Sequence, residues 1–291
     1  MIMTTPTGHR PVLAAVDGSA SSYQAVGWAA AEAVLHDRAL HILTSAETAP
    51  GPAPDPAETE RRRADADRIL GEAAWIARAA VPDRDLAITT EVCAEAPVPL
   101  LIARSADAAI LVVGSRGRGA FQRSLLGSVS TAVTRHARCP VAVVQDFAAL
   151  DPVTRTRPVL VGVDGTANSA PAVALAFEEA ARREVGLIAL HAFSDSSDLP
   201  ALGWEIGRGS AEADLAQMLA GYGERYPRVP VRRVVVANRP VRSLYDESAS
   251  AQLLVVGSHG RGGFASMMLG STSTALLYTV DIPVIVVRER G

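Results

Sequence analysis

The stretch AAILVVGSRGRGAFQRSLLGSVSTAV, residues 108–133, returns with few changes as SAQLLVVGSHGRGGFASMMLGSTSTAL, residues 250–276. Each copy begins with a short apolar run, which predicts a buried strand. A glycine-rich loop follows, and a Gly-Ser pair then opens a helical pattern. A strand that runs through a loop into a helix is the building unit of a parallel α/β sheet.

A second stretch near the start of the chain repeats in the same way. PVLAAVDGSA at residues 11–20 matches PVLVGVDGTA at residues 158–167. The period is a full domain length, so the chain is a domain duplication and not a solenoid of short repeats. Its 291 residues suit two such units, each large enough to bury its own core. We therefore expect a first domain, a linker and a second domain over residues 1–147, 148–157 and 158–291.

Within the first copy, strand and helix patterns alternate along the chain. Short apolar runs predict strands at residues 11–16, 40–45, 86–92, 110–114 and 141–144. Helical patterns lie between them at residues 19–36, 58–80, 98–105 and 128–137. The second copy repeats this order. The alternation predicts an α/β fold with two tandem doubly wound domains, each a parallel sheet with helices on both faces.

The helix expected at residues 58–80 has an apolar face and a basic run. Ile69, Ala73, Ile76 and Ala80 recur along one side, as in a helix that packs on a sheet. The arginines at residues 61–63 could form a basic binding patch, but a solvated helix face is the preferred interpretation because Arg is usually exposed. Ser19 is the expected N-cap of the first helix.

Composition excludes several classes of protein. The net charge of −3 gives no reason to expect nucleic acid or a membrane surface as a partner. No apolar run is long enough to span a bilayer, and the start MIMTTPTGHR lacks the layout of a signal peptide, so a cytoplasmic location is expected. Cys93 and Cys139 form no CxxC pair, so the cysteines predict neither a disulfide framework nor a zinc site.

All 28 basic residues are arginines, and the chain contains no lysine. A Walker-type P-loop needs a lysine to reach the outer phosphates of a nucleotide, so that motif is excluded. Schiff-base chemistry on lysine is excluded for the same reason.

Three polar or glycine-rich pieces follow predicted strands of the first copy. Asp17 follows the first strand, Gly114-x2-Gly117 follows the fourth, and Gly127-Ser128 opens the next helix. In an open α/β sheet, ligands bind outside the carboxyl ends of the strands, where the strand order reverses. The second copy has the same pieces at Asp164, Gly257, Gly260, Gly270 and Ser271.

Together these pieces are suited to binding an anion. Gly114, Gly117 and Gly119 would let the backbone take positive φ and approach a ligand closely. The helix that opens at Ser128 would offer free N–H groups and about half a positive charge, enough to hold phosphates without lysine. Asp17 could accept a hydrogen bond from a ribose hydroxyl or an adenine amino group.

Each piece also has a purely structural interpretation. The Asp17-Gly18-Ser19 segment could be only a turn and an N-cap, and Gly114 and Gly117 could be ordinary turn glycines. The same pieces occur at the same spacing in both copies, which favours a binding site. The charged residues inside the loop could reach phosphates or be exposed; they are Arg116, Arg118, His259 and Arg261.

The motif G-x2-G-x9-G-S/T after a fourth strand, with VDGS after the first, resembles the universal stress protein family in its tandem two-domain form. The resemblance covers nearly the whole chain and is to the ATP-binding branch. It implies five parallel strands of order 3-2-1-4-5 in each copy. It also implies one ATP per domain, with Mg²⁺ bridging the phosphates and Ser128 and Ser271 as the only side chains in reach of the metal.

The resemblance implies nucleotide-binding residues in both copies. In the first copy, the nucleoside would lie near Ala15, Asp17 and Ser45, and the ribose and phosphates near Gly114, Gly117, Gly127, Ser128 and Val129. In the second copy, the matching positions are Gly162, Asp164, Ala192, Gly257, Gly260, Gly270, Ser271 and Thr272. The second strand of the first copy ends in LTS where the family usually has LHV, so its adenine contact departs from the family pattern.

Three function classes fit these motifs. No catalytic signature such as GxSxG, HExxH or CxxC is present, and no pattern identifies a base that would activate water. The preferred hypothesis is an ATP-binding stress-response regulator with little or no turnover, and therefore not an enzyme. The alternatives are a weak ATPase or nucleotidyl enzyme using Asp17 and Asp164, and an interaction scaffold with dispensable nucleotide sites. A scaffold with dispensable sites would be expected to lose the glycine motif in at least one copy, but the motif is intact in both.

The fifth strands also suggest how the domains assemble. Val141–Val144 and Val284–Val287 are apolar on both faces, and the order 3-2-1-4-5 places each at a sheet edge. An exposed apolar edge strand promotes aggregation. We therefore expect these strands to pair with one another or with a second chain, and we expect a homodimer.

Overall fold

The computed structural model describes residues 10–47, 55–117, 126–145, 152–193, 202–237, 239–259 and 269–288, without the side chains of residues 152 and 202–206. The strands of the first repeat are β1 (Val12–Ala15), β2 (Leu40–Ser45), β3 (Ile88–Cys93), β4 (Ile110–Gly114) and β5 (Val141–Val144). Its helices are α1 (Ala20–Leu35), α2 (Pro56–Ala80), α3 (Pro97–Arg104), the 3-10 turn η1 (Ser105–Asp107) and α4 (Ser128–His136).

The second repeat has the same order of elements. A short helix, α5 (Pro152–Arg155), lies in the linker that precedes it. The strands are β6 (Val159–Val163), β7 (Leu187–Phe193), β8 (Val231–Ala237), β9 (Leu253–Gly257) and β10 (Val284–Val287). The helices are η2 (Ala167–Ser169), α6 (Ala170–Arg182), α7 (Leu202–Leu219), α8 (Tyr222–Arg225), α9 (Pro240–Ser248) and α10 (Ser271–Thr279).

The two repeats form one continuous sheet of ten strands. Its order is β3-β2-β1-β4-β5-β10-β9-β6-β7-β8, so each half has the order 3-2-1-4-5. Within each half all neighbouring strands are parallel. The predicted fold class is therefore confirmed, and the strand order reverses between β1 and β4 and between β6 and β9.

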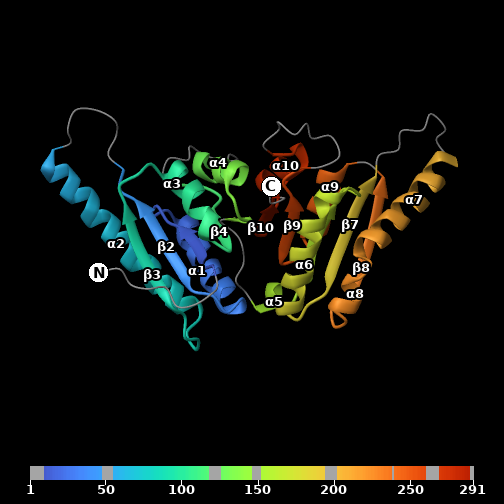
Figure 1. The fold of residues 1–291 in the computed structure, drawn as a ribbon, viewed down its shortest axis with the longest axis horizontal. Coiled ribbons are helices and arrows are strands. Elements are labelled where there is room, and N and C mark those ends of the chain that lie inside the picture. The colour runs from blue at the N-terminus through green and yellow to red at the C-terminus, as the bar shows by residue number, and fades with distance from the viewer. Residues whose placement is uncertain are drawn as a thin grey trace.

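The halves meet where β5 pairs with β10 in the antiparallel direction. Val143 lies opposite Val284, and Val141 lies opposite Val286. Both strands are fully buried, since each covers the apolar edge of the other. This is the first of the two pairings that the sequence suggests. The halves spread from this central pair toward the edge strands β3 and β8 (Figure 1).

Helices cover both faces of the sheet and enclose two cores. One core contains residues from α1, α2 and α6, including Ala29, Ile69 and Phe177. The other contains residues from α3, α4, α9 and α10, such as Leu101 and Leu276. Each core includes residues of both repeats, so the packing is continuous across the junction between β5 and β10.

Local sequence signals account for most helix boundaries. Ser19 caps α1 as predicted, because its side chain accepts a hydrogen bond from the Ser22 N–H at 3.2 Å. Helix α2 begins two residues earlier than predicted, since Asp55 accepts from the Ala57 N–H and caps it. No helix of the described residues is long and apolar enough to cross a membrane.

The apolar face of α2 is slightly rotated from the predicted one. Ile69 and Ala73 are buried as expected, whereas Ile76 and Ala80 are only half-buried. The other buried residues of the helix are Ala66, Leu70, Ala74 and Ala77, which together with Ile69 and Ala73 recur at intervals of three and four residues. This face fixes the position of α2 over β2 and β3.

Replacing Val143 with aspartate should destabilise both halves together. The Val143 side chain is fully buried at the junction, and an unpaired buried carboxylate should lower the free energy of unfolding by more than about 3 kcal/mol. Val231→Asp is the matched control, because Val231 lies on the edge strand β8 and is 37% exposed. Its effect should stay within about 0.5 kcal/mol. Urea unfolding measures both, and equal losses would contradict the role given to the junction.

Candidate functional site

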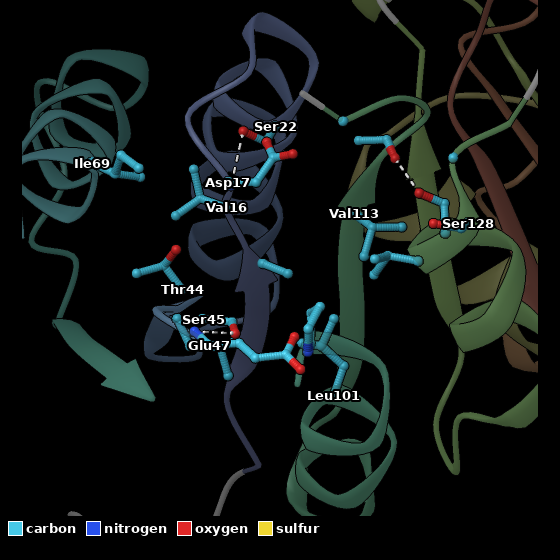
Figure 2. A pocket seen from close by; sticks show the side chains of 18 of the residues that line it. Val16, Asp17, Ser22, Thr44, Ser45, Glu47, Ile69, Leu101, Val113 and Ser128 are labelled. Atoms are coloured by element: carbon cyan, nitrogen blue, oxygen red, sulfur yellow. Dashed lines mark hydrogen bonds between the residues drawn. The ribbon is translucent and has the colours of Figure 1, made fainter. Parts of the chain in front are cut away.

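A cavity of about 840 Å³ opens at the carboxyl ends of β1, β2 and β4 in the first repeat. This is the predicted place, beside the point where the strand order reverses. Figure 2 shows Ile69 of α2, Thr44 and Ser45 of β2, Asp17 after β1 and Val113 of β4 around it, with Ser128 of α4 farther along.

The structure brings together all the residues predicted for the first copy. Each of them lines this cavity: Ala15, Asp17, Ser45, Gly114, Gly117, Gly127, Ser128 and Val129. They come from four separate segments of the chain, so only the fold makes them neighbours. Contact of these residues with a nucleotide remains a prediction.

Asp17 is held in a tight turn directly after β1. Gly18 has a φ of 82°, which favours glycine, and lets the chain turn into α1. The Ser19 N–H and hydroxyl both donate to Asp17 Oδ1, at 3.0 and 2.6 Å. The turn therefore orients the carboxylate, whose other oxygen lies over Gly117: a Cβ on Gly117 would be 2.6 Å from Oδ2.

Gly114 and Gly117 are glycines because other atoms lie too close for a Cβ atom, and not because the backbone takes a positive φ. Neither Gly114 nor Gly117 is among the positive-φ residues of the described chain, so that part of the prediction is wrong. A Cβ on Gly114 would lie 2.7–2.8 Å from the Oγ, C and O atoms of Ser21 at the start of α1. Glycine here lets β4 and α1 meet, which forms one wall of the cavity. Gly119 lies outside the described residues.

The N-terminus of α4 points its first turn at the cavity. The Gly127 N–H donates to the Ser115 carbonyl at 2.8 Å, and the Ser130 hydroxyl donates to the Gly114 carbonyl at 2.6 Å. These bonds fix the helix to the end of β4. The first N–H groups of an α-helix have no intrahelical partner, and here they belong to Ser128, Val129 and Ser130. All three residues line the cavity, so it is an electropositive place for an anion.

One wall of the cavity was not predicted. Thr44, Glu47 and residues of α2, including Arg62 and Asp65, also line it. The Arg62 guanidinium donates to the Glu47 carbonyl at 2.9 Å and to the Glu58 carboxylate at 2.8 Å. Arg62 therefore lies at the mouth of the cavity, while all three arginines of residues 61–63 are exposed, as the solvated-face interpretation expects.

The charged residues of the loop are described only in part. Arg116 lines the cavity, and its main chain is bound to α1 through the Ser21 hydroxyl at 3.3 Å and the Ser19 hydroxyl at 3.4 Å. His259 lies 2.9 Å from the Ser258 hydroxyl. Arg118 and Arg261 lie outside the described residues.

The second repeat has the same anion-binding geometry. Gly165 has a φ of 76°, and the Thr166 N–H donates to Asp164 Oδ1 at 2.8 Å. The Gly270 N–H donates to the Ser258 carbonyl at 2.7 Å, and the Ser273 hydroxyl donates to the Gly257 carbonyl at 2.6 Å. The first repeat has the same two bonds at the matching positions. Ser271 and Thr272 begin α10 in the way that Ser128 and Val129 begin α4.

The nucleoside side of the second repeat differs from the first. A Cβ on Gly162 would lie 3.1 Å from Leu244, so glycine gives Leu244 of α9 room to pack there. His191 is fully buried and its Nδ1 lies 2.8 Å from the Val163 carbonyl, which makes it a structural residue. Ala192 is half-buried at the end of β7. Gly260 lies outside the described residues.

Comparison with known proteins identifies the class. The model of the universal stress protein family matches residues 8–145 and again residues 155–288. The chain therefore belongs to the universal stress protein family, in a tandem form, and has a role in stress responses.

Relatives of the same length have the same organisation. Universal stress protein Rv2005c of Mycobacterium tuberculosis (strain ATCC 25618 / H37Rv) is 45% identical over 99% of this chain and 100% of its own. Universal stress protein Rv2623 of the same strain is 41% identical over 99% of both chains. The crystal structure of a universal stress protein from Archaeoglobus fulgidus DSM 4304 has a TM-score of 0.75 at 23% identity, covering 97% of this chain and 99% of that one, and supports the fold.

Gly114→Ala should lower the free energy of unfolding by about 1–3 kcal/mol, because the added methyl group overlaps the Ser21 backbone. Gly71→Ala is the matched control in the exposed part of α2, where nothing lies within 4 Å of the added Cβ. That change should raise the free energy of unfolding by about 0.5–1 kcal/mol, because alanine favours helix. A Gly114→Ala variant as stable as Gly71→Ala would show that the close approach is not required.

Proposed function

We propose that this universal stress protein binds one ATP in each repeat and acts as a cytoplasmic stress-response regulator with little or no turnover. The phosphates would lie at the N-termini of α4 and α10, with Ser128 and Ser271 as the hydroxyl groups in reach of a bridging Mg²⁺. The nucleoside would lie toward β1 and β2 in the first repeat.

The first turn of α4 carries the proposal. It presents N–H groups to a cavity whose volume, about 840 Å³, is in the range of small-molecule sites. The same cavity is lined by Asp17, suited to a ribose hydroxyl, and by the apolar side chains of Ile69 and Leu101, suited to an adenine ring. A site without lysine can hold phosphates in this way, because helix N-termini bind anions through N–H groups and the helix dipole.

The regulator is favoured over an enzyme by how Asp17 is used. Its Oδ1 already accepts two hydrogen bonds from Ser19, and the turn holds it against Gly117. A carboxylate that orients a turn is suited to binding ribose and is not placed as a free base. At the end of β2, the Ser45 hydroxyl donates to the Glu95 carbonyl at 2.6 Å, so this side chain is held in place. The backbone there would be the contact for the adenine ring.

The assembly of two chains also remains a proposal. Strands β5 and β10 cover one another within the chain, so a homodimer would have to use a different surface from the predicted edge.

ATP should stabilise the protein against unfolding. At a concentration one hundred times its dissociation constant, a ligand adds about 2.7 kcal/mol per site, which appears as a higher melting temperature. Thermal melts with ATP, ADP, AMP and buffer measure this shift. No shift with any of the three nucleotides would contradict the proposal.

Gly127→Arg should abolish ATP binding in the first repeat alone. Gly127 lines the cavity at the N-cap of α4, so a long side chain there would occupy the phosphate position. Gly270→Arg is the equivalent change in the second repeat, and Gly71→Arg, in open space on α2, controls for the added charge. Isothermal titration calorimetry should show half the ATP per chain in either site variant. Full occupancy in Gly127→Arg would exclude this site.

The enzymatic alternative makes a different prediction. A regulator incubated with ATP and Mg²⁺ should release no ADP above the buffer blank. ADP release that disappears in Asp17→Asn would instead support a weak ATPase.

A further inference from the structure

A buried polar cluster lies where α1 of the first repeat meets α6 of the second. Glu32 and His36 lie at the end of α1, and Glu179 and Arg183 lie at the end of α6. The four positions are related by the sequence repeat, because Glu179 matches Glu32 and Arg183 matches His36. The two glutamates are 2% and 1% exposed, so both carboxylates are removed from water.

Arg183 divides the four carboxylate oxygens into two pairs. Its guanidinium donates to Glu32 Oε2 at 2.6 Å and to Glu179 Oε2. The two Oε1 atoms are left facing His36, whose Nε2 lies 3.1 Å from Glu32 Oε1 and 2.9 Å from Glu179 Oε1. Two oxygens and one nitrogen therefore converge from both repeats.

A proton on His36 does not satisfy this arrangement. One N–H group makes one well-aligned hydrogen bond, and here Nε2 is bonded to Glu179. Glu32 Oε1 is buried and makes no hydrogen bond, although Nε2 is nearby. Buried carboxylate oxygens without a hydrogen bond are rare in folded proteins, and each needs an explanation such as an ion.

The geometry points to a divalent transition-metal site, of the Zn²⁺ class, formed by Glu32 Oε1, His36 Nε2 and Glu179 Oε1. The three atoms lie within 4.8 Å of one another. Ligands about 2.0–2.2 Å from a tetrahedral zinc lie about 3.3–3.6 Å apart, so an ion would have to widen the two distances from His36, 3.1 and 2.9 Å, by a few tenths of an ångström. Imidazole and carboxylate together suit Zn²⁺ and similar ions better than Mg²⁺ or Ca²⁺, which prefer oxygen ligands alone.

The surroundings supply what a metal site needs beyond its ligands. Arg183 holds the Oε2 atoms and so fixes both carboxylates, and Glu178 Oε1 lies 3.7 Å from the other ring nitrogen of His36. Hydrogen bonds such as those from Arg183 hold ligating carboxylates in place. A cavity of about 430 Å³ is lined by the three ligand residues and gives an ion a path toward the site.

The competing occupant is a proton. Burial alone would lower the pKa of His36, but the hydrogen bond to Glu179 and the negative charges of Glu179 and Glu32 raise it to about 9. A metal ion must displace this proton, because only neutral imidazole binds metals. A protonated His36 without metal is therefore the alternative that the experiment must separate.

Co²⁺ is the direct probe, because its visible absorption reports tetrahedral coordination. Metal-free full-length chain, without nucleotide, should show saturable d–d bands at one equivalent of CoCl2, and Zn²⁺ should displace them. His36→Arg should lose the bands while keeping the positive charge, as Arg183 does at the matching position. Glu32→Gln is a second variant, which keeps nearly the same side-chain shape but removes the carboxylate, and it should also lose the bands. Circular dichroism melts confirm that both are folded.

His41→Gln is the matched control, because His41 Nε2 faces a single carboxylate, Glu91 Oε2 at 3.0 Å. Loss of the bands in His36→Arg and Glu32→Gln, with retention in His41→Gln, is the expected result. Wild-type chain without d–d bands, or bands that persist in both cluster variants, would overturn the assignment and leave a protonated His36 as the occupant.

Discussion

The antiparallel pairing of β5 with β10 is the contact on which the rest of the structure depends. Without it, each repeat would expose a flat, wholly apolar edge strand. With it, the duplication becomes one sheet of ten strands with continuous cores on both faces. The same pairing brings α1 beside α6, so that Glu32 and His36 meet Glu179 and Arg183. A site that neither repeat could form alone thus results from the junction.

Within each repeat, close approach between the starts of helices and the ends of strands shapes the proposed anion site. Gly114 allows β4 to touch the Ser21 backbone, and Gly117 leaves room for the Asp17 carboxylate. The helix that begins at Ser128 is then held by two hydrogen bonds to the end of β4. This rigid arrangement can substitute for lysine, because its N–H groups are fixed in place before any anion arrives.

The sequence predicted the features that depend on local pattern. Apolar runs located the strands, Ser19 marked the start of α1, and the repeated glycine motif selected residues that the fold brings around one cavity. Features that depend on tertiary packing were missed. The sequence analysis assigned Gly114 to a positive φ, which was wrong. Glycine is required there because the Ser21 backbone, far away in sequence, lies too close for a Cβ atom. The Glu32–His36 cluster could not be assigned from the sequence, because its partners Glu179 and Arg183 are brought close only by the packing of α1 against α6.

Binding of ATP at helix N-termini without lysine can be tested by equilibrium dialysis. The protein is dialysed to equilibrium against ATP and Mg²⁺ and denatured by heat, and the released nucleotide is identified and quantified by HPLC. Unhydrolysed ATP is expected in excess over the dialysis buffer, at one molecule for each of the two repeats. Nucleotide no higher than in the dialysis buffer would show that neither repeat binds ATP.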